Sequence, residues 1–446
     1  MAMPDPLSTA LLTDRYELTM LDAALRDGRG LRPAVFEVFA RRLPPGRRYG
    51  VLAGTGRILE ALARFRFDAD ILDWLDDASV VSTATLEWLA SYRFTGSIHG
   101  YPEGEVYVPG SPVLTVHGSF AEAVVLETLV LSVLNHDSAV AAAAARMVAA
   151  SGGRPLFEFG GRRAHERAAV AAARAAYLAG FAGTSNLEAG RRYGIPTFGT
   201  SAHAFTLLHD SEQDAFAAQV AALGAGTTLL VDTYDTEEGL RTALRVAGTE
   251  LGAVRIDSGD LGSEAVRARK LLDEAGATET RVVLSGDLDE YRLEELRDAP
   301  ADAFGVGTSV VTGSGAPTAG FVYKLVARAD APGGICHPVA KRGGEKATRG
   351  GRKTAWRRLT SGNAVAEVLR PFTASAPAGD VRPLQLPLVV DGEPVAADDL
   401  EEGRARLRRS LDELDDDARA ITDGPVAFPT VFDDDPEARK HPEACA

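Results

Sequence analysis

The segment Arg255-Ile-Asp-Ser-Gly-Asp260 shows the pattern that decides the fold, a short apolar strand that ends in glycine and polar residues. Seven strand ends of this kind lie between Pro155 and Ser309. The other six are Phe157-Glu-Phe-Gly-Gly-Arg-Arg163, Gly183-Thr-Ser-Asn186, Gly199-Thr-Ser-Ala-His203, Val231-Asp-Thr-Tyr-Asp235, Ser285-Gly-Asp287 and Phe304-Gly-Val-Gly-Thr-Ser309. Because the crossover helices of a parallel sheet bring every strand's carboxyl end to one side, we expect these ends to converge on one polar site.

Helical patterns separate most of these strands, which predicts repeated β-α units and a parallel sheet. The predicted helices cover residues 163–178, 211–223, 237–247, 263–275 and 289–298. Seven or eight such units indicate an irregular (β/α) barrel that is closed or nearly closed. A doubly wound open sheet is the alternative, since the repeat of strands and helices does not by itself decide whether the sheet closes into a barrel.

The flanking segments predict a second α/β domain. Helices are expected near 11–27, 54–65 and 82–91, strands at 34–39, 96–101, 105–108 and 113–117, and a long helix over 120–150. We expect an N-terminal domain over 1–120 that part of 330–400 joins, and a catalytic barrel over 121–329. The C-terminal segment, 330–446, contains a basic glycine-rich loop at 341–353 and an acidic, helical tail from about 400.

Composition limits the partners. The 446 residues carry a formal net charge of -15, which argues against non-specific nucleic-acid binding. The two cysteines, Cys336 and Cys445, are too few for a disulfide framework and indicate a reducing compartment. The N-terminus has no basic segment before an apolar one, and the run Ala141–Ala145 is too short to span a bilayer. We therefore expect a cytoplasmic protein with no membrane partner.

Two strand ends suggest sites for anions. The close glycines Gly305 and Gly307 let backbone amides approach a phosphate, and Thr308 adds a hydroxyl donor. A plain tight turn is the alternative. Arg255 has the geometry to clamp a phosphate or carboxylate, and Asp257 to hold a sugar diol or Mg²⁺. The alternative there is a helix-capping aspartate with a surface ion pair.

Two further strand ends carry aromatic or titratable groups. His203 follows Thr200 and Ser201, where a neutral imidazole can act as a base or accept a phosphoryl group. Phe159 with Arg162 offers a ring to stack on a planar heterocycle and a cation to meet its charge. The alternatives are a purely structural role for His203, core packing for Phe159 and a surface salt bridge for Arg162.

Six motifs in order resemble the nicotinate phosphoribosyltransferase family over roughly residues 8–360. They are Thr13-Asp-Arg-Tyr-Glu-Leu-Thr-Met20, Phe157-Glu-Phe-Gly-Gly-Arg-Arg163, Gly199-Thr-Ser-Ala-His-Ala-Phe205, Ile256-Asp-Ser-Gly-Asp-Leu261, Phe304-Gly-Val-Gly-Thr308 and Val322-Tyr-Lys-Leu325. The resemblance implies a type II phosphoribosyltransferase fold and a homodimer with shared active sites. It implies that nicotinate and 5-phosphoribosyl 1-pyrophosphate give nicotinate mononucleotide and pyrophosphate. It also implies coupling to ATP hydrolysis through a phosphohistidine, and a need for Mg²⁺.

The resemblance assigns roles by position. His203 matches the phosphorylated histidine, with Thr200 and Ser201 beside it, and Phe159 and Arg162 match residues at the pyridine ring. The remaining matches are Tyr16 and Asp14 from the second subunit at the ring, Arg255 and Asp257 at the ring and ribose, Gly286 at the substrate, Gly305, Gly307 and Thr308 at the 5-phosphate, and Lys324 at phosphates. Lys346 and Lys353 resemble phosphate contacts only loosely, because Arg349-Gly-Gly351 departs from the family's proline-glycine pair. The metal ligands are not assigned.

Several other functions compete with this interpretation. A nicotinamide phosphoribosyltransferase carries an aspartate where this chain has Ser185, and a neutral serine favours the acid substrate. Quinolinate phosphoribosyltransferases share the fold but need a denser basic pocket. A barrel aldolase or isomerase needs a Schiff-base lysine, and none of the seven strand ends has one. A non-catalytic binding protein would not require the His, Asp and Gly ends to coincide.

Overall fold

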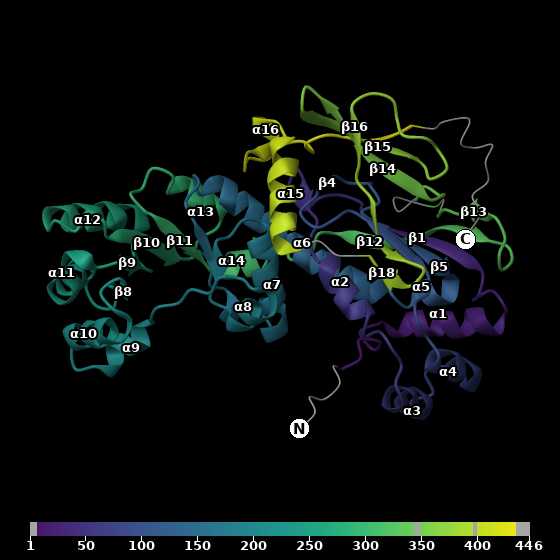
Figure 1. The fold of residues 1–446 in the computed structure, drawn as a ribbon, viewed down its shortest axis with the longest axis horizontal. Coiled ribbons are helices and arrows are strands. Elements are labelled where there is room, and N and C mark those ends of the chain that lie inside the picture. Colours follow the sequence, from purple (N-terminus) through teal and green to yellow (C-terminus); the bar gives the residue numbers. More distant parts are fainter. Residues whose placement is uncertain (1–6, 342, 344–347, 396–398, 434–446) are drawn as a thin grey trace. The chain divides into compact units, whose positions relative to one another are not determined.

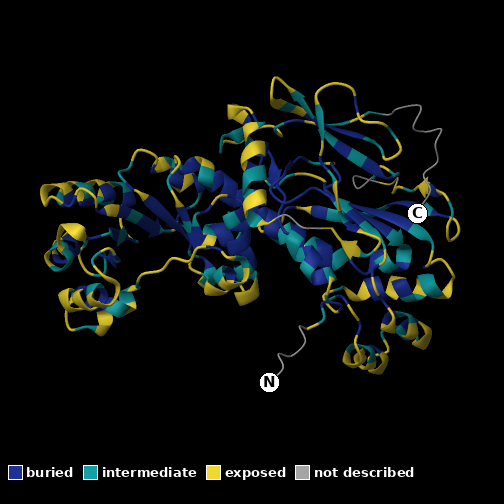
Figure 2. Ribbon diagram, in the orientation of Figure 1, coloured by how far each residue is buried: buried dark blue, intermediate teal, exposed yellow. Residues whose placement is uncertain are grey.

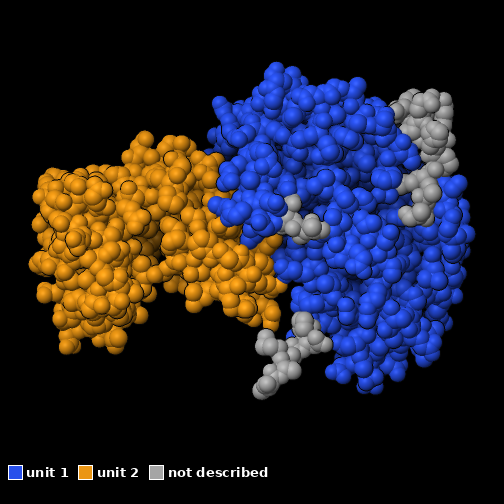
Figure 3. All heavy atoms as spheres, viewed as in Figure 1, with its two compact units in different colours: residues 1–139, 318–446 blue, residues 140–317 orange. Residues whose placement is uncertain are grey.

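The computed structural model describes residues 7–341, 343, 348–395 and 399–433. The chain divides into two compact units, shown in two colours in Figure 3. Unit 1 comprises residues 1–139 and 318–446, and unit 2 comprises residues 140–317. The predicted domain boundaries at 120 and 329 stay predictions.

Unit 2 contains a six-stranded sheet in the order β7-β6-β11-β10-β9-β8, and every pairing in it is parallel. Its strands are β6 Leu156–Glu158, β7 Gly183–Thr184, β8 Thr228–Leu230, β9 Ala253–Ile256, β10 Arg281–Gly286 and β11 Ala303–Val306. The helices around them are η1 Gly161–Arg163, α7 Glu166–Leu178, α8 Leu187–Tyr193, α9 His203–Leu208, α10 Glu212–Leu223, α11 Thr236–Ala247, η2 Gly248–Glu250, α12 Leu261–Glu274, α13 Glu290–Glu295 and α14 Thr308–Val311. Alternation of strands and helices along the chain produces this parallel sheet (Figure 1).

The strands of unit 2 are short and largely buried, and they end where polar residues begin. All four residues of β11 are buried, as are three of the four in β9. Several of the polar residues that follow cap the next helix, since their side chains accept a backbone N–H of its first turn. They are Asn186 of α8, Asp235 of α11, Asp260 of α12 and Asp289 of α13. Capping therefore accounts for part of the polar pattern at the strand ends.

The expectation of seven strands is wrong by one. Residues 199–202 follow only an isolated bridge between Thr184 and Thr197, and His203 is the first residue of α9. Glycine and small polar residues at 199–201 have low strand propensity, so the segment runs as a loop. Among the described residues no pairing joins the sheet's end strands β7 and β8, so closure of the barrel stays a prediction.

Unit 1 contains an antiparallel seven-stranded sheet in the order β13-β12-β1-β5-β3-β17-β18. Its strands are β1 Pro33–Ala40, β3 Ser97–Gly100, β5 Leu114–Ser119, β12 Phe321–Ala329, β13 Cys336–Pro338, β17 Leu386–Val390 and β18 Glu393–Pro394. β2 Gly50–Val51 pairs with β4 Val106–Tyr107. Helices α1 Arg15–Arg26, α2 Thr55–Leu62, α3 Ala69–Asp77, α4 Thr83–Ala90 and α5 Phe120–Val124 contribute to the core (Figure 2). The sequence predicted all of these helices except α3.

A second sheet in unit 1 was not expected. It has four strands in the order β16-β14-β15-β19, formed by Val381–Pro383, Lys353–Thr360, Asn363–Pro371 and Thr430–Phe432. The acidic tail forms α15 Leu400–Asp412 and α16 Asp416–Arg419, as its helical pattern predicted. The parallel strand β19 returns beside β15 from the far end of the tail.

The long predicted helix is present as α5 followed by α6 Glu127–Ala150. In the described part of the chain, Phe120–Ala150 is the one helical stretch long and apolar enough to cross a membrane by length and composition. Its most apolar window is 67% buried inside the protein, as in a core helix. One such helix is weak evidence for a membrane span.

Candidate active site

Phe159 follows β6 and is fixed by backbone and packing contacts. Its N–H donates to the carbonyl of Val306 at 2.8 Å, and its ring lies 6.3 Å from the nearly parallel ring of Phe157. A methyl group on Gly305 would lie 2.5 Å from the ring carbons of Phe159. Gly305 is therefore required by the close approach of this ring, and the ring lies across the end of β11.

Glu158, which the sequence analysis missed, holds two strand ends together. Its buried carboxylate accepts a hydrogen bond from the Thr184 hydroxyl at 2.5 Å and another from the Gly160 N–H. Its carbonyl accepts from the N–H of Ser185 at 2.9 Å. Burial raises the pKa of Glu158. The loop after β6 and the exposed Ser185 after β7 are thus both held by Glu158, the loop through its side chain and Ser185 through its backbone carbonyl.

Arg255 at the end of β9 reaches the loop that precedes His203. Its guanidinium donates to the Ser201 carbonyl at 3.1 Å and lies 3.5 Å from the Thr200 hydroxyl. Burial lowers the pKa of Arg255. The negative charges of Asp257 and Asp232 act in the opposite direction, whereas the positive charge of Arg162 lowers the pKa further. Two guanidinium groups, those of Arg162 and Arg255, therefore act on the same region, where an anion would offset their repulsion.

Asp257 lies one strand away from Ser285 and Gly286. Its Oδ1 accepts from the Ser285 hydroxyl at 2.5 Å, and its N–H donates to Asp232 Oδ2 at 2.8 Å. Gly286 has φ of +134°, a conformation that favours glycine, and a methyl group there would lie 3.0 Å from the Asp257 carbonyl oxygen. The capping role considered for this segment belongs to Asp260, whose side chain accepts from the Ser263 N–H at the start of α12.

Asp232 is a second residue that sequence reasoning did not assign, although it lies within the strand end 231–235. One oxygen accepts from the Asp257 N–H and from the Ser258 hydroxyl, whereas Oδ1 is buried without a hydrogen-bond partner. Next to it, the Thr233 hydroxyl lies 3.1 Å from His203 Nδ1. His203 is thus held by Thr233 at the start of α9 rather than at a strand end.

The last strand end carries Gly307 and Thr308. Gly307 precedes α14, whose first residue, Thr308, is exposed. No group of three or more His, Cys, Asp or Glu residues in the described ranges has the spacing of a metal site. The unpaired oxygen of Asp232 and the neighbouring carboxylate of Asp257 are nevertheless the donor type that Mg²⁺ prefers.

The remaining predicted residues, Asp14, Tyr16 and Lys324, lie in unit 1. Tyr16 on α1 is 44% exposed, and burial together with Glu127, Glu17 and Asp14 raises its pKa to about 12. Glu127 accepts a hydrogen bond from Tyr16 and lies 3.5 Å from the Lys324 amine. Glu127 therefore links Tyr16 with Lys324, a role with no signal in the motifs.

Lys324 also lines a pocket with other cations. Its walls are Arg41, Val322, Lys324, Leu325, Lys341 and Thr348. Lys353, by contrast, is buried with its amine 2.7 Å from Glu37 Oε2, which removes it from the candidates for phosphate contact. Lys346 lies outside the described residues.

Comparisons with known proteins agree with this geometry. Residues 11–135 match the nicotinate phosphoribosyltransferase N-terminal domain, and residues 155–329 match the nicotinate phosphoribosyltransferase family. The chain is 58% identical to nicotinate phosphoribosyltransferase pncB1 of Mycobacterium tuberculosis over 94% of each protein. It is 39% identical to the Bacillus subtilis nicotinate phosphoribosyltransferase over 80% of this chain and 74% of that protein.

A solved structure extends the similarity to the fold. The human nicotinic acid phosphoribosyltransferase is 27% identical, with a TM-score of 0.84 over 96% of this chain and 98% of that one. The family resemblance drawn from six motifs and the expected α/β fold with a parallel sheet and a second α/β domain are confirmed. This chain belongs to the nicotinate phosphoribosyltransferase family.

Proposed function

We propose that this protein transfers the phosphoribosyl group of 5-phosphoribosyl 1-pyrophosphate to the ring nitrogen of nicotinate. The bond from the nitrogen to the anomeric carbon forms while pyrophosphate leaves with the electron pair of the broken carbon–oxygen bond. The observation that carries the proposal is the Phe159 ring fixed against Gly305 at the end of β11, with the charge of Arg162 acting on Arg255 at the end of β9. An aromatic carboxylate suits such residues, because its ring can stack on Phe159 and its charge can pair with an arginine.

The other strand ends have matching tasks. Asp257, oriented by Ser285, is suited to accept hydrogen bonds from the ribose diol. Gly307 and Thr308 are suited to the 5-phosphate. The leaving diphosphate needs cations, and Mg²⁺, which Asp232 and Asp257 would help to hold, supplies charge neutralisation when bound. Nicotinamide is the alternative substrate, which the neutral Ser185 does not favour.

ATP hydrolysis is proposed to drive the reaction through phosphorylation of His203. Thr233 orients the imidazole, and an attacking ring nitrogen takes the γ-phosphoryl group while ADP leaves. His203→Ala should abolish acid-labile labelling by γ-labelled ATP and keep some ATP-independent transfer, because the base and sugar sites remain. His209→Ala is the matched control, since His209 follows the same helix and bonds the Phe205 carbonyl. Undiminished labelling of His203→Ala would identify another acceptor.

The function itself is tested by product formation. Purified protein is supplied with 5-phosphoribosyl 1-pyrophosphate and either nicotinate or nicotinamide, each with and without ATP. We expect nicotinate mononucleotide and pyrophosphate, in larger amounts when ATP is present. Preference for nicotinamide, or no pyrophosphate with either base, would contradict the proposal.

The protein is further proposed to be a cytoplasmic homodimer in which Tyr16 of one subunit completes its partner's site. An exposed apolar stripe on α1 and the segment before it, formed by Leu12, Tyr16 and Met20, supports this because such a stripe is suited to a protein interface. Tyr16→Ala and Phe159→Ala proteins should each be nearly inactive, and mixed dimers should regain one intact site. Confirmed mixed dimers without activity would argue for a site built within one subunit.

A further inference from the structure

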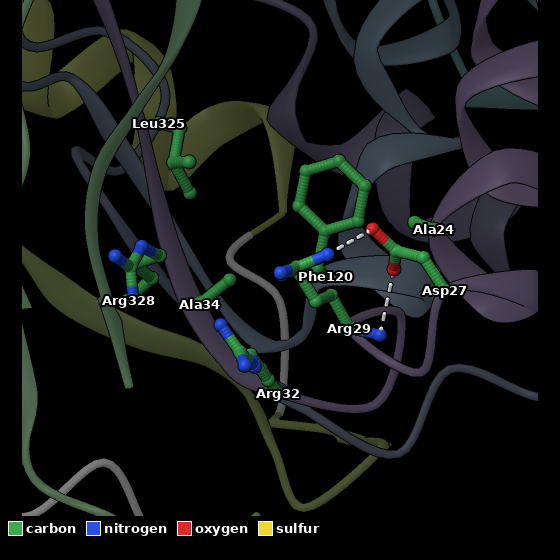
Figure 4. Close-up of a pocket in the computed structure, with 8 residues that line it drawn as sticks. All are labelled: Ala24, Asp27, Arg29, Arg32, Ala34, Phe120, Leu325 and Arg328. Carbon is green, nitrogen blue, oxygen red and sulfur yellow. Dashed lines mark hydrogen bonds and ion pairs between the residues drawn. The ribbon is translucent and has the colours of Figure 1, made fainter. Parts of the chain in front are cut away.

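A pocket in unit 1 is lined by none of the residues to which a catalytic or binding role was assigned above. It has a volume of about 260 Å³ and is lined by residues of α1, β1, α5, β12 and the turn between α1 and β1 (Figure 4). Its volume is near the lower end of ligand pockets, so it suits a small molecule rather than a nucleotide. It shares Leu325 with the pocket around Lys324, but none of its other residues.

The floor of this pocket is apolar. Phe120 and Leu325 contribute the largest apolar side chains, with the small residues Ala24 and Ala34 beside them. The Phe120 ring packs 5.9 Å from the ring of Phe36. A floor of this kind binds a flat apolar body and gives a bare inorganic ion no contact.

The rim of the pocket is positively charged in a protein whose net charge is -15. Three arginines, Arg29, Arg32 and Arg328, line it with one carboxylate, Asp27. In Figure 4, Asp27 bonds to Arg29 beside Phe120, whereas Arg32 and Arg328 lie apart from that pair. The lining therefore has an excess of two positive charges.

The two other arginines are available for a ligand to different degrees. Arg328 forms an ion pair with Asp330, whose side chain is 69% exposed, and such exposed pairs are weak. The guanidinium of Arg32 forms no hydrogen bond or close ion pair with the residues that the structure describes, although its charge also acts on Asp27 and Asp330. A carboxylate would accept bidentate hydrogen bonds from such a group.

From these contacts we infer that the pocket binds a small aromatic monocarboxylate. The ring lies on Phe120 and Leu325, and the carboxylate accepts hydrogen bonds from Arg32 and Arg328. This site is separate from the strand ends of unit 2 and does not depend on their proposed roles. Nicotinate belongs to the same chemical class, so the pocket is a second place where the chain can sense such acids.

Calorimetric titration of the full chain with benzoate, benzamide and inorganic phosphate tests the inference. Phe159→Ala protein is the background, because it lacks the ring that would stack on benzoate in unit 2. In this background benzoate should bind, and benzamide should bind at least tenfold more weakly because it has no charge. In the same background, Arg32→Gln and Arg328→Gln should each weaken benzoate binding at least tenfold. Ala24→Phe should weaken it similarly by filling the pocket. Arg26→Gln is the control, because Arg26 lies on α1 with Ala24 but does not line the pocket, and this variant should bind benzoate normally.

Each other result overturns the inference. Absence of benzoate binding in Phe159→Ala protein would mean that the only site is in unit 2. Equal benzoate affinity after the arginine changes and after Ala24→Phe would exclude this pocket. Phosphate binding as tight as that of benzoate and dependent on the same arginines would make it an inorganic-anion site and refute the aromatic class.

Discussion

At the scale of single residues, we expect Ser185 to decide between acid and amide substrates. An ionised aspartate at 185 would face the nicotinate carboxylate, and like charges about 4 Å apart repel by roughly 4 kcal/mol at an effective dielectric near 20. Because Ser185 is exposed, solvent reduces this to about 1–3 kcal/mol. Ser185→Asp should therefore lower kcat/KM for nicotinate roughly ten- to a hundredfold and raise nicotinamide use only modestly.

The same measurement on Ser185→Asn separates charge from size. Asparagine matches aspartate in shape but is neutral, so kcat/KM for nicotinate should stay closer to that of the wild type. An unchanged nicotinate value in Ser185→Asp would show that residue 185 does not face the pyridine substituent.

Residues in motifs could be predicted, and those that hold them in place could not. Phe159, Arg162, Arg255, Asp257 and His203 stand in segments whose order is visible along the chain. Glu158 and Asp232 act through hydrogen bonds to strands and loops that are distant in sequence. Residue spacing in the sequence does not predict such contacts, because they depend on which strands become neighbours in the sheet.

At the scale of elements, the strand ends combine two tasks that look alike in the sequence. Asp235, Asp260 and Asp289 cap helices, whereas Asp232 and Asp257 lie between neighbouring strands and bond across them. The β-α alternation and nearly all helices were predictable because each is a local pattern. The segment 199–203 resembles a strand end in the sequence because glycine, threonine and serine follow a short apolar stretch there, as they do after the true strands.

The start of α10 gives a prediction about pH. Burial, and then the charges of Glu238, Asp235 and Asp232, raise the pKa of Glu212 from 4.5 to about 7. Between these values the folded state keeps a proton that the unfolded state releases, so stability falls as pH rises from about 4.5 to 7. Because Glu212 is partly exposed, we expect the loss to be about 1 kcal/mol.

Glu212→Gln should remove this pH dependence and stabilise the protein at pH 7. Denaturant unfolding at pH 5 and pH 7 measures the effect, with the exposed Glu237→Gln as control. A pH dependence of equal size in wild type and Glu212→Gln would contradict the assigned pKa.

At the scale of the whole molecule, unit 1 joins its segments through buried charges. Arg357 on β14 is fully buried, 2.9 Å from Glu367 and 3.1 Å from Glu413. Its guanidinium also donates to the Val106 carbonyl at 2.6 Å. These contacts bring together residues of β4, β14, β15 and the tail that lie 10 to 251 positions apart in the sequence, and local sequence patterns do not reveal the distant ones.

Arg357→Met should therefore destabilise unit 1 by about 3–5 kcal/mol, because it leaves Glu367 buried without its cation. Denaturant unfolding measures the loss, and Arg358→Met, a change at the next position of the same strand, should cost much less. Equal small losses in the two variants would show that the buried network does not hold the C-terminal sheet to the rest of unit 1.

The central claim is that the strand ends of unit 2 hold nicotinate for phosphoribosyl transfer. Pyrophosphate release with nicotinate, measured for Arg162→Gln and for its neighbour Arg163→Gln, tests it most directly. Both arginines are exposed on η1, but only Arg162 adds its charge at Arg255. We predict that Arg162→Gln lowers kcat/KM by about a hundredfold or more, from the loss of about 3 kcal/mol of charge-assisted hydrogen bonding, and that Arg163→Gln changes it little. Equal activity of the two variants would contradict the account.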